Sequence, residues 1–255
     1  MTRVRLRGNG VAKRFGRVAA LRGIDFEIEP GEAVSILGAN GAGKSTLLRI
    51  LAGLSRPSGG TFEATREGAD SSPLSRQRLR GQIGYVGHAS LLYGELSAAE
   101  NLLFAGRLAG QRPSAEQVAA LLAEVGLAEV ATQRAGGFSR GMAQRLAIAR
   151  AVVHEPAVLL LDEPFTGLDE VSAERLSLQL AGLREGGRTL VVVTHDPRRA
   201  VELSSRALIL HRGEIVARPA HRELDPGGPE GAGFDVASLR ATLNEIARGV
   251  AEDAA

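Results

Sequence analysis

The segment Gly38-Ala39-Asn40-Gly41-Ala42-Gly43-Lys44-Ser45-Thr46 constrains this chain more than any other stretch of its sequence. It matches the spacing G-x-x-x-x-G-K-[ST]. Glycines let the backbone curl so that successive N–H groups point at one anion, and a helix starting here adds the positive end of its dipole. We therefore predict a phosphate-binding loop in which Lys44 reaches the β- and γ-phosphates of a nucleotide and the Ser45 hydroxyl ligates Mg²⁺.

The residues on either side of this loop favour that interpretation over a chance glycine-rich turn. Residues 33–37 form a short apolar run with Val34 and Ile36, which is typical of a buried parallel strand. After the loop, apolar residues recur at helical spacing until Gly53. Strand, loop and helix in this order are the setting that the motif requires.

Composition limits the class of protein. At 255 residues with 44% apolar content, the chain can hold one large α/β domain or a core with a subdomain. It contains no cysteine, which excludes disulfides and thiolate metal sites. No run of about 18 apolar residues predicts a membrane span, and residues 1–5 lack the pattern of a secretory signal. A net charge of +2, two tyrosines and no tryptophan disfavour nucleic-acid binding.

The periodicity of apolar residues predicts an α/β fold interrupted by a helical insert. Alternation up to about Glu29 and around residues 61–63 predicts β structure, and Gly68 to Pro73 a loop. Further strands are predicted at 83–86, 157–161, 189–193 and 207–210, and helices at 98–108, 115–125, 141–153, 173–183 and 198–203. The tail has a Gly/Pro-rich stretch at 226–229 and an amphipathic stretch at 236–246, which could be a docking helix or a loosely ordered end.

Two further strand ends carry polar residues suited to nucleotide chemistry. The apolar strand before Asp162 and Glu163 ends in two carboxylates, and the carboxyl ends of parallel strands form the ligand crevice. We expect Asp162 to hold Mg²⁺ through water and Glu163 to orient and polarise the attacking water. His195 follows another apolar strand and can contact the γ-phosphate or that water.

A second anion-binding helix start is predicted near residue 139. Ser139 is a natural helix N-cap, and Gly141 permits close backbone approach. Apolar residues from Met142 to Val153 lie on one face of the helix, as in ordinary core packing. The exposed helix start is therefore a candidate anion site, about a hundred residues from the first.

In their order along the chain, these motifs resemble those of an ABC-type ATPase. The phosphate-binding loop, Phe-Ser-Arg-Gly-Met at 138–142, Leu-Leu-Asp-Glu-Pro at 160–164, Thr-Gly-Leu-Asp at 166–169 and Thr-His-Asp at 194–196 carry the resemblance, which extends from about residue 3 to 217. It implies a P-loop NTPase fold with a mixed sheet, an N-terminal antiparallel β region and an inserted helical subdomain. The ATP-binding core would comprise residues 1–87 and 157–218, the helical signature subdomain 88–156, and the tail 219–255.

The resemblance also implies roles for residues that spacing alone does not assign. In this family two subunits pair head to tail, and each ATP lies between the phosphate-binding loop of one and the signature segment of the other. Phe15 would stack on adenine, although the sequence equally allows a core aromatic. Ser139 and Gly141 would bind the γ-phosphate held by the partner, and Asp169 would link the two sites, although it could instead cap the following helix.

Two departures from the family pattern stand out. The usual signature is Leu-Ser-Gly-Gly-Gln, and here Phe138, Arg140 and Met142 replace three of its five residues. Most family members carry glutamine at the position of His88, where it ligates Mg²⁺ and senses the membrane partner. The imidazole of His88 does not have the shape of that amide, so we expect His88 to couple the site to the membrane partner rather than to ligate the metal.

The segment from Gly87 to Leu102, together with the motifs at 138–142 and 161–169, is similar to the haem-exporter ATPase of cytochrome c maturation. That similarity implies a subunit at the inner face of the bacterial membrane, bound to integral membrane subunits, with the cargo never touching this chain. Three alternatives remain: an ABC exporter with another cargo, a non-transport ABC ATPase acting on DNA or ribosomes, and a phosphotransferase. The single phosphate-binding loop and the absence of sustained heptads disfavour the second, and the Phe-Ser-Arg-Gly segment disfavours the third.

Overall fold

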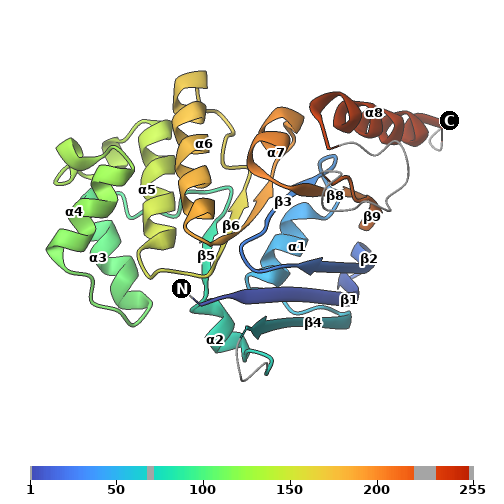
Figure 1. Cartoon of the computed structure of the whole chain (residues 1–255), viewed down its shortest axis with the longest axis horizontal. Helices are drawn as coiled ribbons and strands as arrows, with labels where there is room; N and C mark the ends of the chain where they lie inside the picture. The colour runs from blue at the N-terminus through green and yellow to red at the C-terminus, as the bar shows by residue number, and fades with distance from the viewer. Residues whose placement is uncertain (1, 68–71, 221–233, 253–255) are drawn as a thin grey trace.

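The computed structural model describes residues 2–67, 72–220 and 234–252, and shows two sheets with helices between and around them (Figure 1). The antiparallel sheet has the order β2 (Val18–Ile28), β1 (Val4–Phe15) and β4 (Gly59–Arg66). The larger sheet has the order β5 (Ile83–Val86), β6 (Val158–Asp162), β7 (Thr189–Val193), β3 (Ala33–Leu37), β8 (Arg206–His211) and β9 (Glu214–Ala217). Its pairings are parallel except for β8 with β9.

The first helix lies between the two sheets. Helix α1 (Lys44–Leu51) buries Leu47, Leu48 and Ile50 completely, and these side chains belong to one core with Leu6 of β1 and Leu160 of β6. Because the helix starts at the phosphate-binding loop, both sheets hold the loop in place. The arrangement matches the α/β fold with an N-terminal antiparallel region that the sequence predicts.

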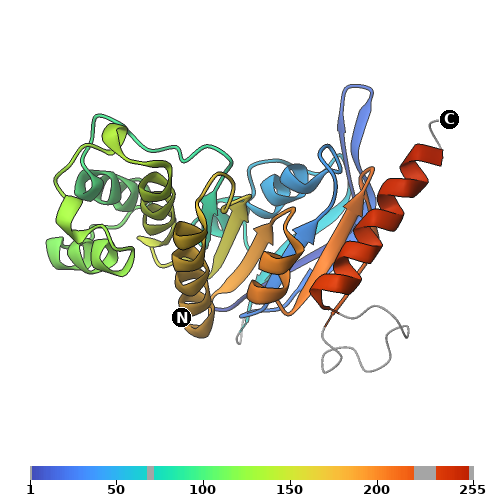
Figure 2. The ribbon, with the colours of Figure 1, turned by 90° about the horizontal axis from the view of Figure 1, so that it is seen from above.

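Of the other helices, α2 packs into the same core as α1, α3 to α5 form the helical insert, and α5 to α8 pack on the opposite face of the larger sheet (Figures 1 and 2). Their bounds are α2 (Arg76–Arg80), α3 (Ala98–Leu108), α4 (Ala115–Glu124), α5 (Arg140–Val152), α6 (Glu170–Glu185), α7 (Pro197–Leu203) and α8 (Val236–Glu252). The apolar face of α5 packs as predicted, with Leu146, Ala149 and Val153 in a core shared with α3 and α4. None of the helices in the described ranges is both long and apolar enough to cross a bilayer.

Several predicted elements differ from the observed ones for identifiable reasons. Helix α6 begins at Glu170 rather than 173, because Asp169 caps it. The sequence missed α2 and β9, both very short, and β9 exists only because the turn at Gly213, with φ 85°, returns the chain along β8. The loop predicted at 226–229 and most of that predicted at 68–73 lie outside the described residues.

The amphipathic stretch in the tail forms a docking helix. Leu239 is fully buried, and Leu243 and Ile246 pack against the same cluster, which contains Ala200 of α7 and Ile209 of β8. Asp235 caps α8 by accepting hydrogen bonds from the backbone N–H groups of residues 237 and 238. The helix therefore completes the core at this end of the sheet (Figure 2).

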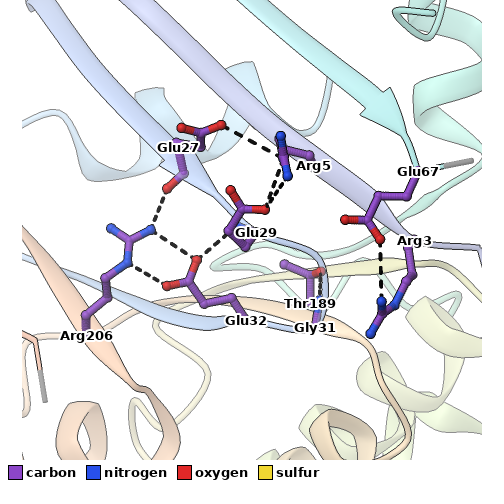
Figure 3. Close-up of polar contacts among 9 residues, drawn as sticks. All are labelled: Arg3, Arg5, Glu27, Glu29, Gly31, Glu32, Glu67, Thr189 and Arg206. Carbon is purple, nitrogen blue, oxygen red and sulfur yellow. Dashed lines mark hydrogen bonds and ion pairs between the residues drawn. The ribbon is translucent and has the colours of Figure 1, made fainter. Parts of the chain in front are cut away.

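A polar network connects the two sheets at the entry to β3 (Figure 3). Arg206 of β8 donates to both carboxylate oxygens of Glu32, with Nη2 3.1 Å from Oε2, and to the carbonyl of Glu27 in β2. The second oxygen of Glu32 also accepts from the N–H of Glu29, whose carboxylate pairs with Arg5 of β1 at 2.9 Å. The side chains of Arg206 and Glu32 are only 19% and 15% exposed.

We expect Arg206→Ala to lower the free energy of unfolding by about 2–3 kcal/mol, because it leaves the carboxylate of Glu32 desolvated without its partner. The matched control is Arg3→Ala, which breaks the pair with Glu67, whose side chains are 66% and 39% exposed. The control should lose less than about 1 kcal/mol. Urea unfolding of both variants measures the difference, and equal losses would contradict this role for the network.

Candidate nucleotide site

Four parallel strands deliver the predicted site residues to one edge of the larger sheet. Val193 pairs with Asp162 on one side and with Ile36 on the other, so the chain leaves β6, β7 and β3 at the same level. The strand ends enclose a cleft of about 700 Å³. It is lined by Val18, Ala19, Ala20, Gly38, Ala39, Asn40, Gly41, Gly43, Lys44, Ser45, Thr46, His88, Asp162, Glu163, Thr166 and His195.

The path of the loop requires glycine at both ends. Gly38 has φ 144°, and a Cβ there would lie 2.2 Å from the carbonyl oxygen of Leu210. Gly43 has φ 107°, and its Cβ would lie 2.5 Å from the carbonyl oxygen of Ala20. Both conformations and both contacts exclude other residues. The loop is therefore pressed against β8 on one side and β2 on the other.

The start of α1 leaves backbone donors for an anion. Gly43 precedes the helix and provides no side-chain cap. By contrast, a side chain caps each helix from α2 to α7 in the described part of the chain. The first N–H groups of a helix have no acceptor within it, so those of α1 face the cleft together with the positive end of the helix dipole.

Lys44 lies at the centre of the loop and is only 7% exposed. Its ammonium donates to the carbonyls of Gly38 and Ala39 at 2.7 and 3.0 Å. Burial lowers the pKa of Lys44, and the nearby carboxylates of Glu163 and Asp162 act in the opposite direction. These contacts hold a cation among the loop's backbone donors, as phosphate binding requires.

The oxygen atoms beside Lys44 suit a magnesium ion. The Ser45 hydroxyl donates to Oδ1 of Asp162 at 3.2 Å, although these residues are 117 positions apart in the sequence. Asp162 is 6% exposed. Mg²⁺ is commonly held by one or two protein oxygens together with phosphate oxygens and water. Within the described residues no group of three or more His, Asp or Glu forms a metal cage, so this pair fits a metal shared with a nucleotide.

Glu163 has an unusual backbone conformation. Its φ is 52°, in the left-handed region that residues other than glycine rarely occupy, and its N–H donates to the carbonyl of Val193 at 2.9 Å. Its carboxylate, 18% exposed, lies 2.8 Å from Nδ1 of His195 and accepts a hydrogen bond in the tautomer that carries the proton on that nitrogen. Strained conformations of this kind cluster at functional sites. The carboxylate of Glu163 therefore lines the cleft, and its contact with the imidazole of His195 holds it in place.

His88 follows β5 and lines the same cleft. It also borders a second, smaller cavity of about 130 Å³ together with Glu163 and Arg140. Its side chain is exposed. The position leaves His88 between the nucleotide cleft and the helical insert, so it can contact both.

Five of the predicted site residues do not line this cleft within one chain: Ala42, which is buried within the loop, Phe15, and the helix-start residues Ser139, Gly141 and Asp169. Ser139 caps α5 by accepting from the N–H of Met142 at 3.3 Å, and its residue is exposed. Gly141 lies two residues further along, in the first turn of α5. Asp169 caps α6 by accepting from the N–H of Ser172 at 2.7 Å, and this hydrogen bond lowers its pKa. Within a single chain, Asp169 therefore acts as the helix cap that the sequence allowed as the alternative to a link between two sites.

Phe15 lies at the tip of the β1–β2 hairpin, which projects from the body of the molecule (Figure 2). It is 54% exposed, with the Lys13 ammonium 5.1 Å from its ring centroid, so the alternative of a core aromatic is wrong. Phe15 pairs with Val18, which lines the cleft. Phe15 therefore lies beside the wall of the cleft but does not itself line it.

Sequence reasoning missed two parts of the cleft. The first is the wall formed by residues 18–20 of β2, whose small and apolar side chains carry no chemical signal. The second is Thr166, which lies three residues after Glu163 within a recognised motif. The requirement for glycine at position 43 is the one signal that could have indicated a close backbone approach there.

Comparisons with known proteins agree with this geometry. The model of a family described as "ABC transporter" matches residues 21–166, more than half of the chain. The aliphatic sulfonates import ATP-binding protein SsuB 1 of Xanthomonas axonopodis pv. citri is 44% identical over 205 residues, covering 78% of this chain and 77% of the relative. The ABC transporter ATP-binding protein NatA of Bacillus subtilis is 36% identical over 81% of this chain and 84% of its own length.

Solved structures show the same fold. The dimeric, post-hydrolysis ATP-binding cassette MJ0796 bound to ADP and Pi superposes with a TM-score of 0.74 at 31% identity, covering 84% of this chain and 98% of that one. An ATP-binding subunit of an ABC transporter gives a TM-score of 0.78 at 26% identity, with coverage of 94% and 99%. The chain belongs to the ABC transporter family and is an ATP-hydrolysing, ATP- and Mg²⁺-binding subunit of such a transporter.

Proposed function

We propose that this chain hydrolyses ATP at a composite site between two head-to-tail copies and thereby drives a transporter at the inner face of a bacterial membrane. One observation carries the proposal. Of the two helix starts that the sequence predicts as phosphate sites, α1 opens into the cleft of its own chain, whereas Ser139 at the start of α5 is exposed outside that cleft. A second copy supplies what the cleft of the first lacks.

At this composite site, different residues of one chain bind the phosphates, the base, the attacking water and the metal. The backbone of the loop and Lys44 bind the phosphates, and Phe15 stacks on the base. Glu163 accepts a hydrogen bond from the attacking water and orients it, while His195 holds the carboxylate of Glu163 in place. Magnesium, held by Ser45 and Asp162, supplies positive charge against the phosphate oxygens.

Residues at the interface link ATP binding to movement of the membrane subunits. Ser139 and Gly141 of one copy donate to the γ-phosphate bound by the other, so the closed dimer is favoured only while triphosphate is present. Asp169 lies at the start of α6, next to this seam, and links the two sites. His88, between the cleft and the helical insert, is placed to pass the change to the membrane subunits.

The cargo that we propose is haem, exported for c-type cytochrome maturation. Support comes from the sequence around His88 and from the Phe-Ser-Arg-Gly-Met segment. Curated relatives bear names for several other cargoes, among them aliphatic sulfonates and phosphonates, so membership of the family leaves the cargo open. The membrane subunits would bind the cargo, and this chain would not contact it.

We expect Glu163→Gln to keep ATP affinity and to trap an ATP-bound dimer, because the amide retains the shape of the side chain but cannot act as a base. Steady-state turnover should fall by a factor on the order of 10² to 10⁴. Analytical ultracentrifugation with ATP should show the dimer, and phosphate release should show the loss of turnover.

The matched control for that variant is Glu163→Gln combined with Lys44→Ala. Removal of the ammonium should abolish ATP binding and with it the trapped dimer. A Glu163→Gln protein that turns over at the wild-type rate would show that Glu163 has another role.

The cargo is tested by purifying the tagged chain from its native membranes and identifying the integral membrane proteins that accompany it. Haem export predicts hydrophobic subunits whose complex binds haem, seen as a Soret band that disappears when those subunits are absent. Recovery of a permease that binds no haem would end the haem proposal and leave the ATPase assignment unchanged.

A further inference from the structure

The connection between β6 and α6, residues 163–169, joins two functional positions. It begins at Glu163, with its strained backbone, and ends at Asp169, which caps α6. Any shift of this connection therefore moves the carboxylate in the cleft and the residue beside the dimer seam together.

One arginine holds this connection to the sheet core. Arg199 of α7 places its guanidinium 5.5 Å from the ring centroid of Phe165, and it pairs with Glu170 at 3.0 Å. Its side chain is only 11% exposed. Helix α7 begins at Pro197, two residues after His195, so this contact lies close to the histidine along the chain.

A second arginine reaches the connection from the helical insert. Arg140 is the first residue of α5, next to Ser139, and its guanidinium lies against Gly167. A Cβ on Gly167 would lie 2.4 Å from Cζ and Nη1 of Arg140 and 2.7 Å from its Nε. The planar guanidinium thus covers the space that a side chain would need.

The start of α5 also rests on the start of α6. A Cβ on Gly141 would lie 3.0 Å from Oγ of Ser172 and 3.9 Å from Cδ2 of Leu168. Arg140 and Gly141 therefore fix the serine-capped tip of α5 to the connection that carries Glu163, all within one chain. Arg140 also borders the 130 Å³ cavity that Glu163 and Thr166 line.

We propose that Arg140 is a positioning residue that ties the tip bearing Ser139 to the Glu163 connection of the same chain. This inference rests on the proposed composite site. When hydrolysis moves the connection in one copy, Arg140 carries the tip with it and changes how Ser139 meets the nucleotide of the other copy. The two sites thereby influence each other through an intrachain contact.

The competing explanation is that Arg140 contacts the partner's nucleotide directly. Mixed dimers separate the two. In a dimer of an intact copy and a Lys44→Ala copy, the one working site uses the loop of the intact copy and Ser139 of the Lys44→Ala copy. Arg140→Ala is then placed in either copy, and the single-turnover rate of ATP hydrolysis is measured.

We expect both placements to lower the hydrolysis rate about tenfold. Arg140→Ala in the intact copy loosens the Glu163 of the working site, and Arg140→Ala in the Lys44→Ala copy displaces the Ser139 of that site. A loss confined to one copy, or no loss in either, overturns the inference. The matched control is Arg134→Ala, an exposed arginine of the helical insert whose side chain is 74% exposed. It should leave the rate unchanged in both placements.

A second measurement tests the contact itself. Gly167→Ala should displace the guanidinium and lower the rate. Because the φ of 73° at Gly167 disfavours alanine in either background, the same substitution in an Arg140→Ala protein should still lower the rate, but roughly fivefold less. Arg140→Lys should behave like Arg140→Ala, since an ammonium does not lie flat on the glycine. Independent, multiplicative effects of the two substitutions overturn the contact.

Failure of the proposed function gives a different result from failure of this inference. If Glu163→Gln forms no dimer with ATP, the composite site is wrong and the inference falls with it. If that dimer forms and the mixed dimers respond in only one placement or in neither, the composite site stands and the role of Arg140 is wrong. Thermal melting of Arg140→Ala should match that of wild type, because its residue is exposed.

Discussion

The close approach of the loop's backbone to both sheets is the constraint on which the rest of this structure depends. Gly38 lies against the carbonyl of Leu210 in β8, and Gly43 lies against that of Ala20 in β2. Helix α1 then enters the core between the sheets. The N–H groups at the start of α1 have no side-chain cap, which by itself destabilises the start of a helix. Burial of α1 and the two glycine contacts compensate, because they fix the path of the loop.

Chemistry follows from the order of strands around this loop. Because β3 lies beside β7, and β7 beside β6, the residues after each strand end meet at the loop. Asp162 thereby reaches Ser45, and Glu163 reaches His195. The strained φ of Glu163 is held by the hydrogen bond from its N–H to Val193 on the neighbouring strand. The sheet therefore supplies the rigidity that the site needs.

Sequence predicted the parts of this structure that depend on local pattern. The bounds of α3 and β7 coincide with the apolar periodicity, and glycine spacing located the loop. What it could not predict depends on residues far apart in the chain. The left-handed conformation of Glu163, the wall formed by residues 18–20 and the contact of Arg140 with Gly167 arise from tertiary packing, which periodicity does not encode. Asp169 combines the two. The sequence predicted that it either caps the following helix or links the two sites, and the single chain shows the cap.

The central claim is that ATP is bound between the loop of one copy and the α5 tip of another. The chain contains no cysteine, so thiols can be placed at will. Ala39→Cys in one tagged copy and Gly137→Cys in a differently tagged copy put thiols on the exposed loop and in open space beside Ser139. With ATP and a short thiol cross-linker, the account predicts a covalent species carrying both tags. Cross-linking that ignores ATP, or that occurs only within a chain carrying both substitutions, would contradict it.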